Sequence, residues 1–515
     1  MKEDGVSVLL LMLEIFTALL LALLVGLVIA AFVAYVRDTR QTTQTIRRNY
    51  PVIGRFRYIL EHLGGFFRQY FYAMDREELP FNRAQRSWVY RAAKNVDNTL
   101  AFGSTQTSTA PGTLIFSPHP FPSLNEGQEP TAITIGPYCR QPYLTRALVN
   151  ISAMSFGAIS KPAVTALSLG AKKAGCWLNT GEGGLSTYHL SGGADLVFQI
   201  GTAKYGVRDE KGNLSDQRLT AIAEHPEVKM FEIKISQGAK PGKGGILPGL
   251  KVTAEIADIR GIPQGLDSIS PNGHLDIRSI HQLLDSIEHI RQVTGKPVGF
   301  KMVAGDLRFF ADLCDQVLAR GEQAAPDFIT LDSGDGGTGA APQSLLDHAG
   351  LPIRESLPVV VDILRDRGLK ERIKIIASGK LILPVDVAWA LCTGADFVNT
   401  ARGFMFALGC IQSLQCNKNT CPTGITTHNP HLQRGLDPAN KAERVAQYVH
   451  NLVKEVTVIA HSCGVDCPRE LQRHHVRIVT RPGFSVPLDQ FYHHELRRIA
   501  MPGESADTSG PVQLQ

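Results

Sequence analysis

From about residue 145 onward, short apolar runs alternate with longer amphipathic stretches. Apolar runs of this length between turn signals are typical of buried strands, and the amphipathic stretches between them are typical of helices. The chain contains eight such runs: Ala147–Ser152, Cys176–Thr180, Asp195–Ile200, Lys229–Ile235, Pro297–Val303, Phe328–Asp332, Ile373–Ala377 and Asp396–Thr400. This alternation predicts an α/β fold, a (β/α)8 TIM barrel, with a doubly wound open sheet as the alternative.

A different pattern, one long apolar run, lies near the start of the chain. Residues Ile15 to Val36 contain no charged side chain and are rich in Leu, Ala and Val. As a helix, 22 residues rising about 1.5 Å each span roughly 33 Å, enough to cross the core of a bilayer. A signal peptide would be shorter and would end in a cleavage site, which this run lacks. We therefore expect one uncleaved transmembrane helix over residues 15–36.

The charges that flank this run predict its orientation. Between Arg37 and Lys94 there are twelve Lys or Arg and five Asp or Glu, whereas only Lys2 is basic before the run. The positive-inside rule then predicts a single-pass protein of the cell inner membrane whose catalytic body lies in the cytoplasm. The same basic stretch suits contact with anionic membrane lipid, and a solvated helical surface is the alternative.

The amino-acid composition indicates which kind of protein follows the apolar run. The chain has 515 residues, of which 43% are hydrophobic and 20% are charged, as in a globular protein. A net charge of +5, without an aromatic–basic stripe, argues against nucleic acid as a partner. Many of the 48 glycines cluster in the loops that follow the predicted strands, where backbone can approach a ligand closely. In a barrel, these loops gather at the carboxyl end of the strands.

One glycine cluster matches a nucleotide-binding motif by spacing alone. Gly334-x-Gly336-x-x-Gly339 fits the dinucleotide fingerprint, but Ala340-Ala341-Pro342 follows where a helix should continue. We interpret the segment as a loop of the barrel mouth and not as an NAD site.

Three of the nine cysteines form a motif, Cys410-x5-Cys416-x4-Cys421-Pro422. Three thiolates in one short loop suit a cuboidal iron–sulfur cluster with three irons, whereas zinc usually takes four ligands in paired short spacings. Three structural cysteines are the alternative. Cys463 and Cys467 are compatible with part of a metal site or with a structural pair. An odd total indicates a reducing compartment rather than a disulfide scaffold.

Five spaced motifs carry a family resemblance. They are Ile151–Lys161, Asn179–Gly184, Gln237–Gly245, Gly336–Ala340 and Asn419–Pro422. Together they resemble the FMN-binding synthase domain of glutamate synthase, over roughly Pro130 to Asn429. Members of that family make L-glutamate from 2-oxoglutarate, through 2-iminoglutarate, on a barrel that carries FMN and a [3Fe–4S] cluster.

The resemblance implies roles for residues at the strand ends. Lys301 suits the N1/O2 edge of the flavin, where negative charge develops on reduction. The ends of the last two strands suit the phosphate. The predicted cofactor residues are Ser152, Ala153, Met154, Asn179, Thr180, Lys301, Gly336, Gly337, Ser378, Gly379, Lys380, Thr400, Ala401 and Arg402. Cys410, Cys416 and Cys421 are the predicted cluster ligands.

The substrate site requires fixed cations. Lys240 and Arg260 match the positions at which the family holds the two carboxylates of 2-oxoglutarate. Glu182 and Gln237 would orient the imine or donate a proton. The predicted catalytic residues are Glu182, Lys240 and Gln237, and the predicted substrate-binding residues are Lys240, Arg260 and Gln237.

The chain also departs from the family. It has Ile246 where the family usually carries glutamine, which weakens the expectation of 2-oxoglutarate specificity. It starts Met1-Lys2 without the nucleophilic cysteine of a glutaminase domain, so we expect ammonia, or an amide nitrogen donor on a partner, as the nitrogen source. No nicotinamide domain is evident, so we expect electrons from a ferredoxin or a separate subunit, and an oligomer is compatible with this.

Two other functions stay open at this point. One is a related enzyme that joins an amine to glutamate, and the other is a membrane flavin and iron–sulfur electron-transfer subunit. An electron carrier would not need the Lys240, Arg260 and Glu182 pocket. We expect five segments: a transmembrane helix (15–36), a basic juxtamembrane and lead-in segment (37–130), the barrel with its iron–sulfur loop (131–430), a C-terminal helical extension (431–501) and a disordered tail (502–515).

Overall fold

The computed structural model describes residues 2–41, 43–125 and 129–492. The tail expected over 502–515 lies outside the described residues. The chain divides into two compact units, Met1–Ala84 and Gln85–Gln515, and the second unit holds the barrel.

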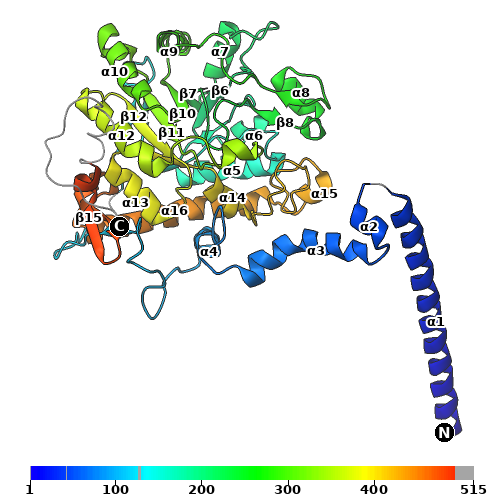
Figure 1. Ribbon diagram of the computed structural model, residues 1–515. Coiled ribbons are helices and arrows are strands. Elements are labelled where there is room, and N and C mark those ends of the chain that lie inside the picture. Colours follow the sequence, from blue (N-terminus) through cyan, green and yellow to red (C-terminus); the bar gives the residue numbers. More distant parts are fainter. Residues whose placement is uncertain (1, 42, 126–128, 493–515) are drawn as a thin grey trace. The chain divides into compact units, whose positions relative to one another are not determined.

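Eight parallel strands of the second unit form a closed barrel (Figure 1). They follow one another around the barrel in chain order, and the last strand pairs with the first to close it. The strands are β4 (Val149–Ile151), β5 (Leu178–Asn179), β6 (Leu196–Ile200), β7 (Val228–Lys234), β10 (Val298–Val303), β11 (Phe328–Asp332), β12 (Lys374–Ser378) and β13 (Phe397–Thr400). Each overlaps one of the eight predicted runs, so the predicted barrel is confirmed and the open sheet is excluded.

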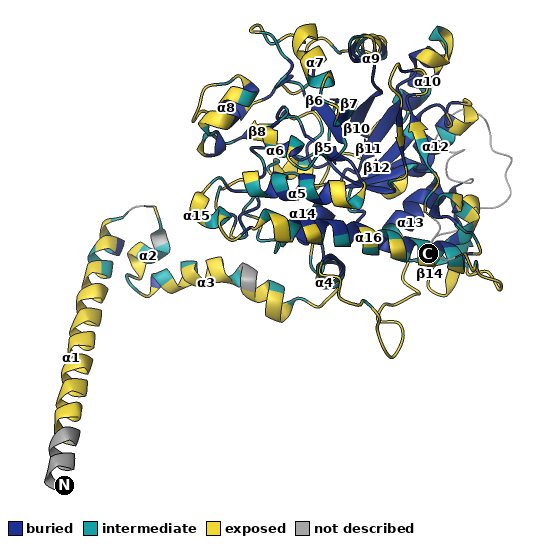
Figure 2. Ribbon diagram, turned by 180° about the vertical axis from the view of Figure 1, so that it is seen from behind, coloured by how far each residue is buried: buried dark blue, intermediate teal, exposed yellow. Residues whose placement is uncertain are grey.

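Helices surround the barrel, and their inward faces are buried (Figure 2). In the first of them, the Ser160 side chain accepts a hydrogen bond from the Ala163 N–H, and Gly175 ends the helix in the left-handed conformation, with φ of 67°. The helical elements of this part are α5 (Lys161–Ala174), α6 (Thr187–Leu190), α7 (Asp216–Ala223), η2 (Gly249–Lys251), α8 (Ala254–Arg260), α9 (Ile280–Thr294), α10 (Arg308–Arg320), η3 (Glu322–Ala324), α11 (Gln343–Leu346), α12 (Ile353–Asp366), α13 (Pro384–Thr393) and α14 (Arg402–Leu408). A short pair, β8 (Ile246–Leu247) and β9 (Ser268–Ile269), lies in the segment between β7 and α9.

The amino end of the barrel has an apolar floor. An antiparallel hairpin, β2 (Ile133–Ile135) and β3 (Tyr143–Thr145), packs against it. The rings of Tyr143 and Trp177 meet edge to face at 6.3 Å, and those of Trp177 and Phe397 at 5.0 Å. This cluster closes the barrel away from its carboxyl end, so the open end is the one with the glycine-rich loops.

Further toward the carboxyl end, the barrel interior becomes polar. The buried carboxylate of Glu232 accepts hydrogen bonds from Asn179 Nδ2 at 2.8 Å, Gln199 Nε2 at 2.5 Å and Thr330 Oγ1 at 2.6 Å. A buried carboxylate is costly unless hydrogen bonds satisfy it, so these contacts favour one relative placement of four strands.

After the barrel, the chain forms α15 (Pro430–Gln433) and the long helix α16 (Pro438–Ser462), which packs against α5. It then forms two short 3-10 helices and two strands: η4 (Pro468–Glu470), η5 (Arg473–His475), β14 (Val476–Arg481) and β15 (Phe484–Pro487). The helical pattern of this region did not indicate the strands. β14 pairs antiparallel with both β15 and β1 (Leu114–Phe116), so the three strands form one sheet with β14 in the middle.

The first unit is helical. It consists of α1 (Lys2–Arg40), α2 (Thr45–Asn49), α3 (Gly54–Phe67) and a π-helical turn, η1 (Arg68–Tyr72); α4 (Arg83–Ala93) lies across the division between the units. Within the described residues, one stretch, Leu10–Arg40, is long and apolar enough to cross a membrane by length and composition. The predicted apolar helix near the N-terminus is thereby confirmed as a helix.

Candidate active site

A partly buried ion pair lies at the centre of the carboxyl end of the barrel. The Nζ of Lys234, the last residue of β7, lies 2.6 Å from Oε1 of Glu182, which belongs to the loop after β5. Burial raises the pKa of the Glu182 carboxyl, but Lys234, aided by Lys240 and Arg260, outweighs burial and lowers it below its ordinary value. Glu182 is therefore ionised at neutral pH.

Two glycines make room for this carboxylate. A Cβ on Gly201 would lie 2.6 Å from Oε2 of Glu182, and a Cβ on Gly245 would lie 2.7 Å from Oε1. Because any side chain at either position would collide with the carboxylate, the glycines of these two loops hold space around Glu182.

Lys240 and Arg260 lie beside the ion pair and are both buried. Burial, together with repulsion from Lys234, lowers the pKa of Lys240 to about 8. Within the described residues, no hydrogen-bond acceptor or anionic partner contacts its ammonium group. The Lys240 charge is thus held in the site without a neutralising contact of its own.

Arg260 ends α8 and lies 5.2 Å over the ring of Tyr205. Its Nη1 donates to Ser268 Oγ and its Nη2 to the Phe156 carbonyl, both at 3.3 Å, while its buried Nε has no partner among the described residues. Burial lowers the pKa of this guanidinium, against the attraction of Tyr205 and Glu182. Two long hydrogen bonds and one unused donor leave the group available to a ligand.

The flavin edge predicted for Lys301 contains a second ion pair. Lys301, in β10, places Nζ 3.3 Å from Oδ2 of Asp332, at the end of β11. The same oxygen accepts a hydrogen bond from the Gly238 N–H at 2.9 Å, so the loop after β7 is tied to β11. Gln237 precedes that glycine and is half-buried.

The phosphate region predicted at the ends of β12 and β13 gathers two cations around Asp335. Lys380 Nζ lies 2.9 Å from Asp335 Oδ2, and Arg402 Nη2 donates to the Asp335 carbonyl at 3.3 Å. Burial lowers the pKa of Arg402 to about 10, against the attraction of Asp335. A Cβ on Gly337 would lie 2.9 Å from Arg402 Nε, and Gly379 has φ of 117°. These contacts bring Gly337, Gly379, Lys380 and Arg402 together.

The remaining predicted cofactor residues surround the same end. The Ser152 N–H donates to the Thr400 carbonyl at 3.1 Å, which joins the ends of β4 and β13. Asn179 and Thr180 are buried, and their side chains are hydrogen-bonded within the barrel. Their side chains are thus used within the barrel, so these two residues shape the loop at the predicted flavin site.

The three cysteines of the motif lie close together in the loop after α14. Burial raises the pKa of the Cys410 thiol, and repulsion from Cys416 and Cys421 adds to this. Burial also raises the pKa of Cys421, but hydrogen bonds from Thr423 and Thr426 outweigh it and lower the value. Within residues 2–41, 43–125 and 129–492, no group of three or more His, Cys, Asp or Glu side chains is arranged to hold a metal ion.

The loop after β4 connects the cysteine loop with the predicted substrate pocket. The buried Lys251 donates from Nζ to the Ala158 carbonyl at 2.6 Å and to the Cys416 carbonyl at 3.4 Å. His428 Nε2 lies 2.8 Å from the Gly157 carbonyl, and Arg260 reaches the adjacent Phe156 carbonyl. One short segment, residues 156–158, thus contacts both the predicted cluster loop and the predicted substrate cation.

Sequence reasoning missed two residues of the pocket. Lys234 ends a strand, as Lys301 nearly does, so the argument used for Lys301 could have found it. His274 lies in the loop before α9 with Nε2 2.9 Å from the Lys234 carbonyl, and burial lowers its pKa. No motif surrounds His274, so the sequence carried no signal for it.

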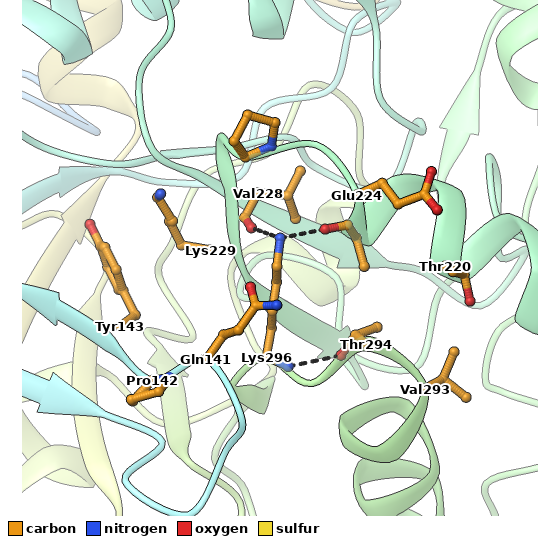
Figure 3. A pocket seen from close by; sticks show the side chains of 12 residues that line it. Gln141, Pro142, Tyr143, Thr220, Glu224, Val228, Lys229, Val293, Thr294 and Lys296 are labelled. Carbon is orange, nitrogen blue, oxygen red and sulfur yellow. Dashed lines mark hydrogen bonds between the residues drawn. The ribbon is translucent and has the colours of Figure 1, made fainter.

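A cavity of about 500 Å3 lies at the opposite, amino end of the barrel, where no site residue was predicted (Figure 3). Lys296 extends into its wall and donates from Nζ to the carbonyls of Ala223 and Val228, both at 2.5 Å, and of His225 at 3.2 Å. All three N–H groups of this ammonium therefore have an acceptor, and we assign Lys296 to the structure of this end.

Comparison with known proteins agrees with the motifs. The family model "Conserved region in glutamate synthase" matches residues 119–466. The glutamate synthase large subunit-like protein YerD of Bacillus subtilis (strain 168) is 39% identical over 517 residues, which cover 92% of this chain and 98% of that protein.

Two further relatives carry enzyme names. The archaeal glutamate synthase [NADPH] of Methanocaldococcus jannaschii is 35% identical over 335 residues, 64% of this chain and 61% of that protein. The archaeal-type glutamate synthase [NADPH] of Thermotoga maritima is 35% identical over 326 residues, 63% and 61% respectively. The chain thus spans less than two thirds of these two enzymes. On the extent of the family match and the similarity to YerD, the chain belongs to the glutamate synthase family.

Proposed function

We propose that the chain is a glutamate synthase-like oxidoreductase that converts 2-oxoglutarate, through 2-iminoglutarate, to L-glutamate. The charge of the pocket at the carboxyl end is the observation that carries this proposal. Lys234, Lys240 and Arg260 bring three positive charges around the single carboxylate of Glu182. The excess of two positive charges matches the two carboxylates of a 2-oxo diacid.

The residues of the mouth fit FMN. Lys380 and Arg402 together exceed the charge of Asp335 by one, which suits a phosphate. Gly337 and Gly379, where a Cβ would collide with Arg402 and Ser333, bring backbone into this crowded region without a side chain. Lys301 would hold the N1/O2 edge of the ring. When bound there, FMN would supply the hydride that reduces the imine carbon.

The cysteine loop fits a three-iron cluster by its donor set. Cys410, Cys416 and Cys421 lie near enough to interact electrostatically, and a cuboidal cluster keeps its ligand sulfurs farther apart than a single metal ion would. Replacing Cys416 with serine should remove the iron while the flavin is retained. Iron analysis of the anaerobically purified protein tests this, and absence of iron from the unmodified protein would exclude the cluster.

Two different side chains of the pocket would carry out the proton transfers. Glu182 is ionised, so it accepts a hydrogen bond from the incoming nitrogen and takes up its proton. Lys240 has a pKa of about 8, near the pH at which it works, so it can give a proton to the carbonyl oxygen that leaves as water. Lys234 holds Glu182 in place, and Arg260 anchors a substrate carboxylate.

The experiment is to reduce the flavin chemically, add ammonia and follow its reoxidation with 2-oxoglutarate, oxaloacetate or pyruvate. We expect 2-oxoglutarate to react fastest and pyruvate, with one carboxylate, slowest. The Lys240→Met variant should lose the reaction, whereas Lys229→Met, a half-exposed lysine at the amino end of the barrel, should keep it. Equal reoxidation by all three acids, or by none, would contradict a diacid site and favour the electron-transfer alternative.

One observation favours a second reaction in the same pocket. Ile246 is 40% exposed and pairs across β8–β9 with Ile269, which is 64% exposed. An apolar rim next to Gly245, which borders Glu182, would suit an alkyl amine as the nitrogen donor. Replacing ammonia with methylamine in the same experiment tests this use of an alkyl amine. Methylamine and the 2-oxo group would form an imine with loss of water, its reduction by the reduced flavin would give N-methylglutamate, and product analysis detects that compound.

We also propose that α1 anchors the protein in the inner membrane with its body in the cytoplasm. Support comes from the apolar stretch Leu10–Arg40 and from the excess of basic residues after it. A reporter fused after Gln515 should be active in the cytoplasm, and deletion of residues 1–37 should release the protein from membranes. An external C-terminus would contradict the orientation.

A further inference from the structure

An apolar helix face is exposed in the first unit. The apolar side chains of α3 and η1 recur every three or four residues, which places them on one side of the helix. They are Phe56, Ile59, Leu60, Leu63, Phe67, Tyr70 and Phe71, and all are exposed. Phe56 and Leu60 are each 62% exposed, far more than aromatic and aliphatic side chains of a buried face would be.

The opposite side of the same helix is basic. Arg57 and Arg68 lie there with Glu61, whereas Arg55 lies at the other flank of the helix, where it pairs with Asp38. From Arg37 to Arg76 the chain has eight arginines and three acidic residues. A helix with one apolar face and one arginine-rich face has the composition of an interfacial membrane helix.

A buried carboxylate fixes where this helix starts. Asp38, near the end of α1, has a fully buried side chain that accepts hydrogen bonds from Arg47, Arg55 and the Val52 N–H. Arg47 Nη2 lies 2.7 Å from Asp38 Oδ1, and Arg55 Nε lies 2.8 Å from Oδ2. Because Arg55 is the second residue of α3, its contact with Asp38 holds the start of α3 within one side-chain length of the end of α1.

We propose that α3 and η1 lie in the surface of an anionic bilayer, with the apolar face in the boundary between headgroups and acyl chains. This inference rests on the proposed anchoring by α1. If α1 spans the bilayer, the Asp38 contacts place the start of α3 where the chain leaves it. Figure 1 shows α3 running across the axis of α1 and not continuing it, as a helix along the surface must.

Charge and side-chain type favour lipid as the occupant of this face. The aromatic residues Phe56, Phe67, Tyr70 and Phe71 are of the kind that gathers at membrane–water interfaces. The arginines of the other side match the negative surface of the cytoplasmic leaflet, which attracts basic residues close to the membrane. A protein surface would need to be both apolar and strongly acidic to match both sides.

The test uses the full-length protein in vesicles and a matched pair of tryptophan substitutions. Phe56→Trp places the probe on the apolar face, and Tyr58→Trp places it two residues away, on the polar side. Each is compared with the parent protein, whose signal from Trp88, Trp177 and Trp389 is subtracted. In phosphatidylglycerol vesicles with brominated acyl chains, quenching at position 56 should exceed that at position 58 by about threefold or more. In phosphatidylcholine vesicles, quenching at position 56 should be weaker.

Flotation of the vesicles after carbonate extraction reports on α1 separately. If the protein fails to float, the anchor is wrong. If it floats but position 56 is quenched no more than position 58, the anchor stands and the interfacial helix is wrong. Protection of position 56 from an aqueous quencher, without quenching by brominated lipid, would mean that protein covers the face and would also overturn the proposal.

Discussion

At the amino end of the barrel, the ammonium of Lys296 donates hydrogen bonds to three backbone carbonyls. At the carboxyl end, by contrast, the ammonium of Lys240 contacts no acceptor among the described residues, and the buried Nε of Arg260 has no hydrogen-bond partner there. The amino end contains a cavity of about 500 Å3, yet its buried cation is fully satisfied. The carboxyl end keeps three cations around one carboxylate. Unbalanced buried charge, more than cavity size, therefore identifies the end of the barrel that receives a ligand.

The largest expected effect comes from removing the unbalanced charge. In the Arg260→Ala variant, one charge-assisted contact with a substrate carboxylate, worth about 1.5–3 kcal/mol, is lost. The affinity for 2-oxoglutarate should fall by roughly ten- to hundredfold or more, with the flavin spectrum unchanged. Titration of the reduced protein with 2-oxoglutarate measures this.

Arg208 provides the matched control. Its guanidinium lies 5.0 Å over the same Tyr205 ring, but its Nη2 donates to the Gly261 carbonyl at the surface. Arg208→Ala should therefore bind 2-oxoglutarate as the parent protein does. An equal loss of affinity in both variants would mean that Arg260 acts through the packing of Tyr205.

The second prediction concerns the opposite end. Lys296→Met leaves the carbonyls of Ala223 and Val228 without a donor, and unsatisfied buried groups cost about 1–3 kcal/mol each. The variant should unfold at a temperature several degrees lower, while its affinity for 2-oxoglutarate stays the same. Loss of affinity without loss of stability would reverse the roles assigned to the two ends.

Much of the barrel could be predicted because its strands are buried on both faces. Such strands read as apolar runs, and the carboxyl-end loops that follow them contain the predicted Glu182, Lys240 and Lys380. The sheet of β1, β14 and β15 was missed for two reasons. The hairpin of β14 and β15 has a local turn signal, Pro482-Gly483, that was not used, and β1 pairs with β14 although it lies more than three hundred residues earlier in the chain. No local pattern shows such a pairing.

In the candidate active site, too, contacts between distant parts of the chain could not be predicted. The motif residues lie in glycine-rich loops and are visible in the sequence, but the partners that set their charge state are not. Lys234 and His274 contact the pocket only because β7 and the loop before α9 meet in the folded chain. The structural role of Lys296 likewise depends on carbonyls of a helix end and a strand start.

The third prediction is that the affinity for 2-oxoglutarate depends on pH through Lys240, at the carboxyl end of the barrel. Burial lowers the pKa of Lys240 from 10.5 to about 8, so its positive charge is lost as the pH rises through about 8. The affinity for 2-oxoglutarate should fall in that range. Without substrate, the unfolded state binds the extra proton between pH 8 and 10.5, so the stability contributed by this group rises over the same window.

With rising pH, the affinity for 2-oxoglutarate should fall while the stability contributed by Lys240 rises, so the assignment of this titration to Lys240 can be tested. The pH dependence of affinity should disappear in Lys240→Met and persist in Lys229→Met, in which only a half-exposed lysine of the amino end is lost. Measurement of the 2-oxoglutarate dissociation constant of both variants from pH 7 to 9.5 tests this. An unchanged profile in Lys240→Met would assign the titration to another group.

The smallest expected effect concerns the rim of the carboxyl end. Ile246 is partly exposed beside Gly245, whose backbone borders the Glu182 carboxylate. In Ile246→Gln, an amide would replace the apolar side chain at this rim, and one added hydrogen bond to the substrate would be worth about 0.5–1.5 kcal/mol. Preference for 2-oxoglutarate over oxaloacetate should then rise by roughly two- to tenfold, and use of methylamine should fall. Ile269→Gln, the cross-strand neighbour, is the control for a general change in rim polarity. If both variants shift the preference equally, polarity of the rim and not a specific contact at position 246 sets the choice of substrate.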